Sequence, residues 1–346
     1  MKRYPSGDIR PGCSARVFQA LIFFLVVIAL FSVIIFTSSK LLDSVAPVSL
    51  RWKQATSEAA FSARRGQASL VFNDQIWVMA GWDGTSTKND VWSSTDGISW
   101  SLATASAAWS KRNTPVCLVF DSKMWLLGGY TNDSNKYNND VWNSADGINW
   151  IQVTPSAPWS GRSNHSGLIF DNKMWIMGGY NFYKFSNDVW CSTDGLNWTE
   201  VASSAPWPAR TGTQCLVFDN KMWVIGGSGS NSNYSDAWYS TDGKDWTAVT
   251  TEAPWGSRTA HSCLIYGKSL LLIGGYQSVT TADLTYKNDV WSTSDGITWT
   301  KIAAVAVFPG RFYHSSLVYK SKLWVIGGGD GTGVKNDVWS CRPSRF

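Results

Sequence analysis

The feature that most constrains this chain is a unit of about 50 residues that recurs six times. Five copies contain the related segments NDVWSSTDGISW, NDVWNSADGINW, NDVWCSTDGLNW, SDAWYSTDGKDW and NDVWSTSDGITW, and a shorter NDVWSC follows near the end. The first shared aspartates are spaced 50, 48, 48, 53 and 48 residues apart and are Asp90, Asp140, Asp188, Asp236, Asp289 and Asp337. Repeats of this length bury their apolar faces by stacking on their neighbours, so the sequence predicts a ring or array.

Each unit has the pattern of four short strands. In the fourth copy, QCLVF is followed by a two-residue turn, then KMWVIGG, a loop, SDAWYS, the turn Thr-Asp-Gly and a strand around Trp246. An Asp-Gly pair between apolar strands is a strong hairpin signal, because its glycine accepts a positive φ. Six four-stranded units predict an all-β, six-bladed β-propeller with antiparallel blades.

The first strand of each unit is apolar on both faces, which predicts that it is sandwiched between neighbouring blades. One face carries leucine in every copy, and the alternate face carries Val71, Val119, Ile169, Val217, Ile265 and Val318. Most of the 22 tryptophans occupy repeat positions. The aromatic residues are therefore expected to be mainly core.

The strand that the sixth copy lacks is found before the first copy. Trp52 is followed twelve residues later by Arg64, and the same spacing separates a tryptophan from an arginine in the five other units. The segment around Trp52 is therefore expected to be the fourth strand of the last blade, which would close the ring and cover a sheet edge.

The N-terminal region predicts a membrane anchor. Residues 17–36 are uncharged and apolar, and about 20 residues of helix span a bilayer core. We expect 1–16 to be a basic cytoplasmic tail, 17–36 a transmembrane signal-anchor helix, 37–49 a linker, and 50–346 an extracytoplasmic propeller. A cleaved signal peptide is the alternative, although its apolar region is usually only about 7–15 residues long.

The units resemble kelch repeats. The resemblance rests on a glycine pair that ends the second strand, a later tryptophan, and Arg-x-x-His before the first strand, as in Arg162/His165, Arg258/His261 and Arg311/His314. It covers roughly residues 50–342 and implies an antiparallel propeller that binds protein or glycan. Gln67, Pro115 and Thr213 replace the histidine, and Ala80 replaces a glycine. The turns also resemble shortened versions of the Asp-box of sialidases.

No residues form a recognisable catalytic or metal-binding constellation. The three histidines have no companion cluster of cysteine or carboxylate ligands, and we find no equivalent of the tyrosine, histidine and cysteine set of copper oxidases. We therefore predict no cofactor and no metal, and place a sialidase-like glycoside hydrolase second to a binding function. The net charge of +5 is concentrated before residue 17, so the sequence gives no basic surface for nucleic acid.

Periodic charges indicate a structural role. An arginine precedes each first strand and an aspartate opens each third strand, so both are expected at the same end of a blade and to brace it as Arg–Asp pairs. The arginines are Arg64, Arg112, Arg162, Arg210, Arg258 and Arg311.

The irregular parts of the repeat are the better candidates for function. Loops between second and third strands, and connections from a fourth strand to the next unit, emerge on one face, here called the loop face. The tight turns emerge on the opposite turn face. The loops carry aromatic residues outside the repeat pattern, namely Trp82, Tyr137, Phe182, Tyr183, Phe185, Tyr234 and Tyr286. We expect a membrane-anchored module that binds a protein or glycan ligand there.

Overall fold

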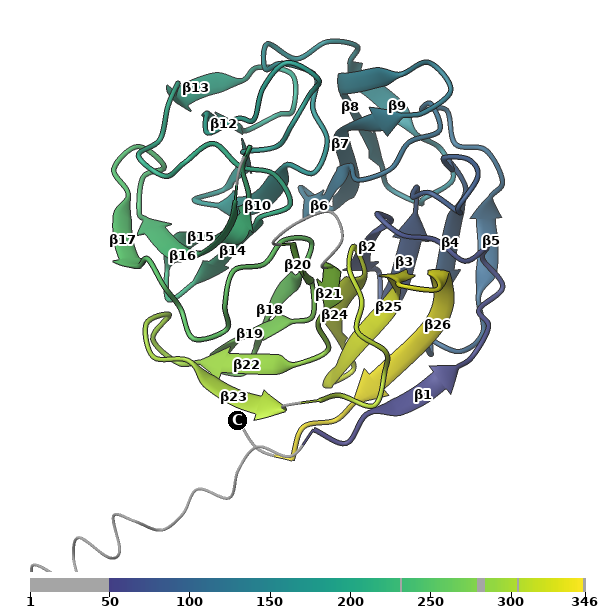
Figure 1. Ribbon diagram of the computed structural model, residues 1–346. Helices are drawn as coiled ribbons and strands as arrows, with labels where there is room; N and C mark the ends of the chain where they lie inside the picture. The colour runs from purple at the N-terminus through teal and green to yellow at the C-terminus, as the bar shows by residue number, and fades with distance from the viewer. Residues whose placement is uncertain (1–49, 231, 279–283, 304, 345–346) are drawn as a thin grey trace, which may run out of the picture. The chain divides into compact units, whose positions relative to one another are not determined.

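The structure is a computed structural model that describes residues 50–344 except 231, 279–283 and 304. Six four-stranded sheets surround a central axis (Figure 1). In each sheet the strands are antiparallel neighbours in the order predicted from the repeat. The six-bladed all-β propeller is thus confirmed. The described residues include no helix long and apolar enough to cross a membrane, and the predicted anchor at 17–36 lies outside them.

The blades follow one another along the chain. The strands of blade 1 are β2 (Ala68–Phe72), β3 (Gln75–Met79), β4 (Val91–Ser94) and β5 (Ser101–Thr104). Those of blade 2 are β6 (Val116–Phe120), β7 (Lys123–Thr131), β8 (Lys136–Ser144) and β9 (Ile151–Thr154). Those of blade 3 are β10 (Ser166–Phe170), β11 (Lys173–Met177), β12 (Val189–Ser192) and β13 (Thr199–Ala202).

The second half of the ring repeats this plan. Blade 4 contains β14 (Gln214–Phe218), β15 (Lys221–Ser228), β16 (Asn233–Ser240) and β17 (Thr247–Thr250). Blade 5 contains β18 (Ser262–Tyr266), β19 (Ser269–Ile273), β22 (Val290–Thr293) and β23 (Thr300–Ala303), and a separate hairpin of β20 (Tyr276–Ser278) and β21 (Leu284–Tyr286) lies in its loop. Blade 6 contains β24 (Ser315–Tyr319), β25 (Lys322–Asp330), β26 (Gly333–Cys341) and β1 (Lys53–Thr56).

The strand β1 supplies the outer edge of blade 6. It pairs antiparallel with β26, and Lys53 lies opposite Ser340. Trp52, immediately before β1, is buried, and its ring meets Phe308 edge to face at 5.1 Å. The first and last segments of the propeller therefore form one sheet, side by side in Figure 1.

The residue types in the turns account for the geometry of the turns. In blade 4 the connection from β14 to β15 is Asp219-Asn220, whose φ angles are 49° and 52°, as a two-residue hairpin with primed geometry requires. In the Asp-Gly turn of blade 2, the hydroxyl of Ser144 accepts the N–H of Gly147 at 2.8 Å. The carboxylate of Asp146 accepts the N–H groups of Ile148 and Asn149, each at 2.8 Å.

These Asp-Gly turns also join neighbouring blades. A Cβ atom added to Gly147 of blade 2 would lie 2.2 Å from the indole of Trp77 in blade 1. The same close approach pairs the turn glycines of blades 1, 3, 4 and 5 with Trp324, Trp125, Trp175 and Trp223 of the preceding blades. Blade 5 has Leu271 where the other second strands have tryptophan, and blade 6, which follows it, has no such turn. The indole and the turn that covers it are therefore present or absent together.

The prediction that both faces of each first strand are buried was only partly right. The residues on the alternate face, including Val71 and Ile169, are half-buried, and Val119 is 38% exposed. The first strand is the innermost strand of each blade, and Val119 lies next to the turn that ends it, so the neighbouring blade covers this face incompletely.

Candidate functional site

Six buried Arg–Asp pairs join the first and third strands at the loop-face end of the blades. In blade 2, the guanidinium of Arg112 donates to both carboxylate oxygens of Asp140, at 2.6 and 2.8 Å, and to the carbonyl of Gly128 at 2.8 Å. The indole N–H of Trp142 donates to the same carboxylate at 2.8 Å. Every blade repeats the arrangement, in the pairs Arg64–Asp90, Arg112–Asp140, Arg162–Asp188, Arg210–Asp236, Arg258–Asp289 and Arg311–Asp337.

These arginines are engaged by the scaffold itself. Their side chains are at most 1% exposed. Burial raises the pKa of Asp140, but hydrogen bonds from Arg112 and the attraction of its charge outweigh this effect, so the pKa is lowered overall. Both partners are therefore charged and mutually satisfied, and neither is free to bind a ligand.

A second ring of contacts surrounds the axis. Two residues after each buried arginine, the backbone has a positive φ, between 49° and 63°. At this position each N–H donates to the carbonyl of the equivalent residue in the preceding blade, at distances between 2.6 and 3.3 Å. The six members, which we call the inner ring, are Gly66, Thr114, Asn164, Gly212, Ala260 and Tyr313. The bonds close a full circle, because Gly66 donates in turn to Tyr313.

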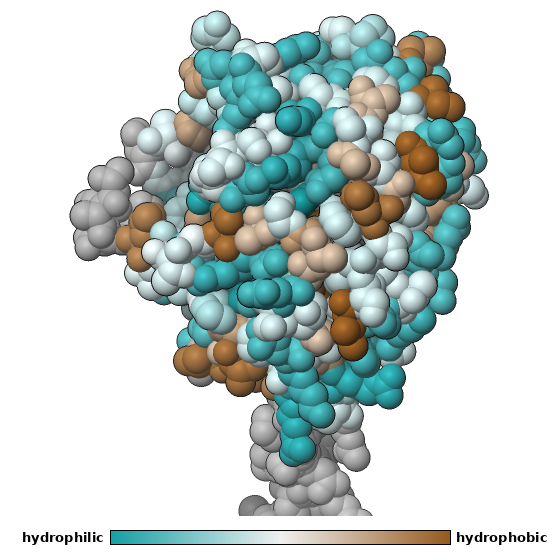
Figure 2. Space-filling view, turned by 90° about the vertical axis from the view of Figure 1, so that its right-hand side faces the viewer, coloured by the Kyte–Doolittle hydropathy of each residue, from teal (hydrophilic) through white to brown (hydrophobic). Residues whose placement is uncertain are grey.

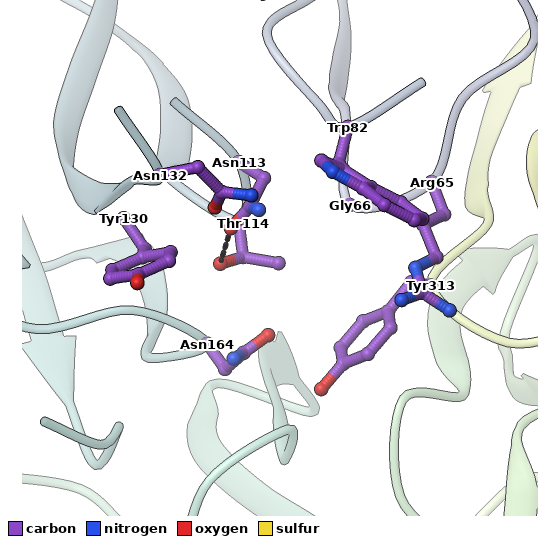
Figure 3. A pocket seen from close by; sticks show the side chains of 9 residues that line it. All are labelled: Arg65, Gly66, Trp82, Asn113, Thr114, Tyr130, Asn132, Asn164 and Tyr313. Atoms are coloured by element: carbon purple, nitrogen blue, oxygen red, sulfur yellow. Dashed lines mark hydrogen bonds between the residues drawn. The ribbon is translucent and has the colours of Figure 1, made fainter. Parts of the chain in front are cut away.

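A pocket of about 300 Å³ lies above one side of the inner ring (Figure 3). We call it the axial pocket. Figure 3 shows Trp82, Arg65 and Tyr313 on one side, facing Tyr130 and three asparagines across the cavity. Its lining residues come from blades 1, 2, 3 and 6 and are Arg65, Gly66, Trp82, Asn113, Thr114, Tyr130, Asn132, Asn164 and Tyr313.

Arg65 differs from the six buried arginines. Its guanidinium carbon lies 4.6 Å from the centre of the Trp82 ring and 5.1 Å from that of Phe312, so the group is held between two aromatic rings. Among the residues that the structure describes, no carboxylate forms an ion pair with it. Burial raises the pKa of the neighbouring Tyr313 phenol, and the charge of Arg65 opposes that shift. The axial pocket thus has a positive charge beside a neutral hydroxyl.

The three histidines lie deeper, around a second cavity of about 120 Å³ that shares Gly66, Thr114, Asn164 and Tyr313 with the axial pocket. Burial, together with neighbouring arginine charges, lowers the pKa of each histidine to about 3. At neutral pH they are therefore uncharged. The ring of His165 packs over Gly128 of the preceding blade, where an added Cβ would lie 2.8 Å from it, and His314 hydrogen-bonds Ser262 at 2.9 Å.

These histidines predict a stability that declines in acid. The unfolded chain takes up protons near pH 6.5, whereas the folded chain does so only near pH 3, so protonation favours unfolding as the pH falls between these values. From pH 7 to pH 5 we expect a loss of about 1–2 kcal/mol for each histidine. The measurement is chemical denaturation at both pH values.

The chain supplies its own control for this prediction. Blade 1 has Gln67 at the histidine position, and its amide donates to the carbonyl of Ile326 at 2.8 Å. The His314→Gln variant should therefore remain folded. The part of the pH dependence of its unfolding free energy that is attributed to the histidines should be smaller by about a third. If the unfolding free energy of that variant depended on pH as strongly as that of the unmodified protein, the buried histidines would not be the cause of the pH dependence.

The structure distributes the seven predicted loop aromatics among several environments. Only Trp82 lines the axial pocket. Tyr286 stacks on Phe312 at 5.2 Å beside a further cavity of about 270 Å³, and Tyr234 lies against Arg210 at 4.4 Å. Four others are in blades 2 and 3, where Tyr137 meets Phe182 at 4.9 Å, Phe185 meets Tyr180 at 4.9 Å, and Tyr183 is 94% exposed.

Most residues of the axial pocket were not predicted from the sequence. Arg65 and Asn113 immediately follow the repeated arginines, and Asn164 and Tyr313 lie two residues after them. The signal was available in the repeat, because these two positions differ from blade to blade while the arginine and the following strand do not. A variable position within a regular repeat at the ring axis is a better guide to this pocket than an aromatic residue in a long loop.

Comparisons with known proteins agree with this architecture. A solved structure of YjhT is similar, with a TM-score of 0.68 and 17% identity over 82% of this chain and 96% of that one. No curated protein matches the chain. The model of the family described as the KLHDC2/KLHL20/DRC7 Kelch-repeats domain matches residues 94–275, just over half of the 346 residues. The chain belongs to the kelch-repeat family of β-propellers.

Proposed function

We propose that this propeller is a membrane-anchored, extracytoplasmic protein-binding module that receives an acidic group of its partner in the axial pocket. Kelch propellers are typically protein-interaction modules, and this chain has the fold and the repeats of that family. The observation that carries the proposal is Arg65, a cation at the pocket that has no acidic partner among the described residues.

The surroundings of Arg65 favour binding of an anion over a structural role. A guanidinium presents its N–H groups in a planar fork that matches a carboxylate, and the contacts with the rings of Trp82 and Phe312 restrain the position of that group. The described lining of the pocket contains no aspartate or glutamate that could compete for it. A carboxylate of a partner, from a side chain or a chain end, would supply the missing charge.

The remainder of the pocket suits an extended segment of a protein. The side chains of Asn113, Asn132 and Asn164 can donate and accept hydrogen bonds with peptide groups, and Trp82 and Tyr130 offer apolar faces. A volume of about 300 Å³ admits one or two side chains. We therefore expect the partner to insert a loop or terminus.

The location is proposed from the sequence. The apolar run at 17–36, with basic residues before it, favours a cytoplasmic N-terminus and an exported propeller. A protease added outside intact cells should then remove a C-terminal tag and spare an N-terminal one. Protection of the C-terminal tag would contradict this orientation.

A peptide selection tests the binding proposal. Random peptides displayed on phage would be selected on the immobilised protein, and we expect the enriched peptides to share an aspartate, a glutamate or a free C-terminal carboxylate. Arg65→Met should weaken their binding at least tenfold, about 1.4 kcal/mol, because the charge pair is lost.

The matched control is Lys322→Met. Lys322 also lies over an aromatic ring, that of Trp324 at 5.5 Å, but it begins β25 on the turn face. This variant should bind the selected peptides as the unmodified protein does. Selection of peptides without acidic groups, or equal binding by Arg65→Met, would contradict the proposal.

A glycan ligand is the second candidate, on one observation. The ring of Tyr183 is almost fully exposed at the tip of a turn in which Asn181 accepts the N–H groups of Tyr183 and Lys184, each at 3.0 Å. A fixed, exposed aromatic ring beside an amide is suited to stacking on a sugar. Glycan-array binding that Tyr183→Ala abolishes and Arg65→Met preserves would favour this candidate.

A further inference from the structure

We propose that the turn face docks on the lipid surface of the membrane, so that the loop face and its axial pocket point away from the bilayer. This inference rests on the anchoring part of the proposed function. It concerns a surface at the opposite end of the blades from the axial pocket.

The N-terminal segment joins the propeller at the turn-face end of blade 6. β1 begins at Lys53, which lies opposite Ser340, near the end of β26. β26 runs from its hairpin with β25 on the loop face to the turn face, so Leu50 and Trp52 lie at the turn-face end of blade 6. The linker at 37–49 has thirteen residues, which can extend over at most about 45 Å. A propeller tethered there would remain close to the bilayer with its turn face nearest the attachment.

The turns themselves carry a set of exposed aliphatic side chains. The residue after each Asp-Gly pair is 53% exposed at Ile98, Ile148 and Leu196 and 58% exposed at Ile297. Blade 4 has the exposed Lys244 at the same position. Leu102 and Ile151, near the start of the following strands, are 47% and 65% exposed. Four of the five Asp-Gly turns thus present an aliphatic side chain at one end of the ring.

The spacing of these side chains favours lipid over a protein partner. Figure 2 views the side of the ring that carries β5 and β9, and shows hydrophobic side chains that stand apart among hydrophilic ones toward its right-hand side, and others that adjoin one another at the lower left. A protein interface buries a continuous apolar centre, whereas separate aliphatic anchors can each enter the interfacial region of a bilayer. Lysines and aspartates on the neighbouring turns of the same face, such as Lys221 and Asp219 between β14 and β15, would remain in the headgroup layer.

The experiment uses the full chain and vesicles of phosphatidylcholine. Flotation with the vesicles first tests the anchor at 17–36. The environment-sensitive fluorophore NBD would then be attached at Ile148→Cys on the turn face or at Tyr183→Cys on the loop face, and the unmodified chain labelled in parallel would give the background from native cysteines. Lipids that carry a nitroxide quencher report which label is near the membrane.

We expect quenching at least threefold stronger at position 148 than at position 183. With the label kept at 148, replacing Ile98, Leu196 and Ile297 by serine should reduce quenching at least twofold. Equal or stronger quenching at 183, or none at 148, in a chain that floats would overturn the docking while leaving the anchor intact. Failure to float would overturn the anchor and the docking together.

Discussion

Asp140→Asn is expected to reduce the free energy of unfolding by about 3–5 kcal/mol, because it leaves the buried charge of Arg112 without its partner. The Arg112 side chain is 0% exposed, and the carboxylate also accepts the indole N–H of Trp142 at 2.8 Å. Denaturant titration of the variant and the unmodified protein measures the difference.

The same substitution at an exposed pair is the control. Asp171 and Lys173 form an ion pair at 3.3 Å in which the side chains are 74% and 37% exposed. Asp171→Asn should change the free energy of unfolding by less than about 1 kcal/mol, since water screens the pair. Similar small effects at both sites would show that the buried pairs do not brace the blades.

Gly147→Ala is expected to destabilise the protein by about 2–5 kcal/mol, from the strain of a left-handed alanine and the collision with Trp77 together. Gly147 has a φ of 76°, and the added Cβ would lie 2.2 Å from the indole. Gly256→Ala separates the two effects, because Gly256 has a φ of 73° and nothing within 4 Å of an added Cβ. That variant should lose only about 1–2 kcal/mol.

A double variant tests the link between the two blades directly. Trp77→Leu reproduces the residue found at Leu271, where no Asp-Gly turn follows in the next blade. With leucine at position 77, Gly147→Ala should cost less than it does opposite tryptophan. Fully additive effects would mean that the turn and the indole stabilise the ring independently.

The repeat made most of the scaffold predictable. Six copies of four strand-like segments imply a closed ring, and the spacing from Trp52 to Arg64 indicated which strand completes blade 6. The periodic arginines precede the first strands and the periodic aspartates lie in or just before the third strands, at the same end of each blade. They form six pairs there. These predictions depend on local residue types and on order along the chain.

The axial pocket depends instead on contacts between blades far apart in sequence. Arg65, Asn113 and Tyr313 come from blades 1, 2 and 6 and are brought together by the hydrogen bonds of the inner ring. The predicted loop aromatics showed which loops differ between blades, but they did not show where these side chains lie in the fold. Loops of neighbouring blades meet, and their aromatic rings pack on one another. Tyr137, for example, contacts Tyr180 of blade 3 at 5.9 Å.

The central claim, that a partner binds at the axial pocket on the loop face, is tested most directly by amide hydrogen exchange of the full chain with and without a selected acidic peptide. We expect the peptide to slow exchange in the segments around Arg65, Asn113, Tyr130 and Tyr313, and to leave the turn at Asp219 unchanged. Protection confined to the turn face, with the axial pocket unaffected, would contradict the account.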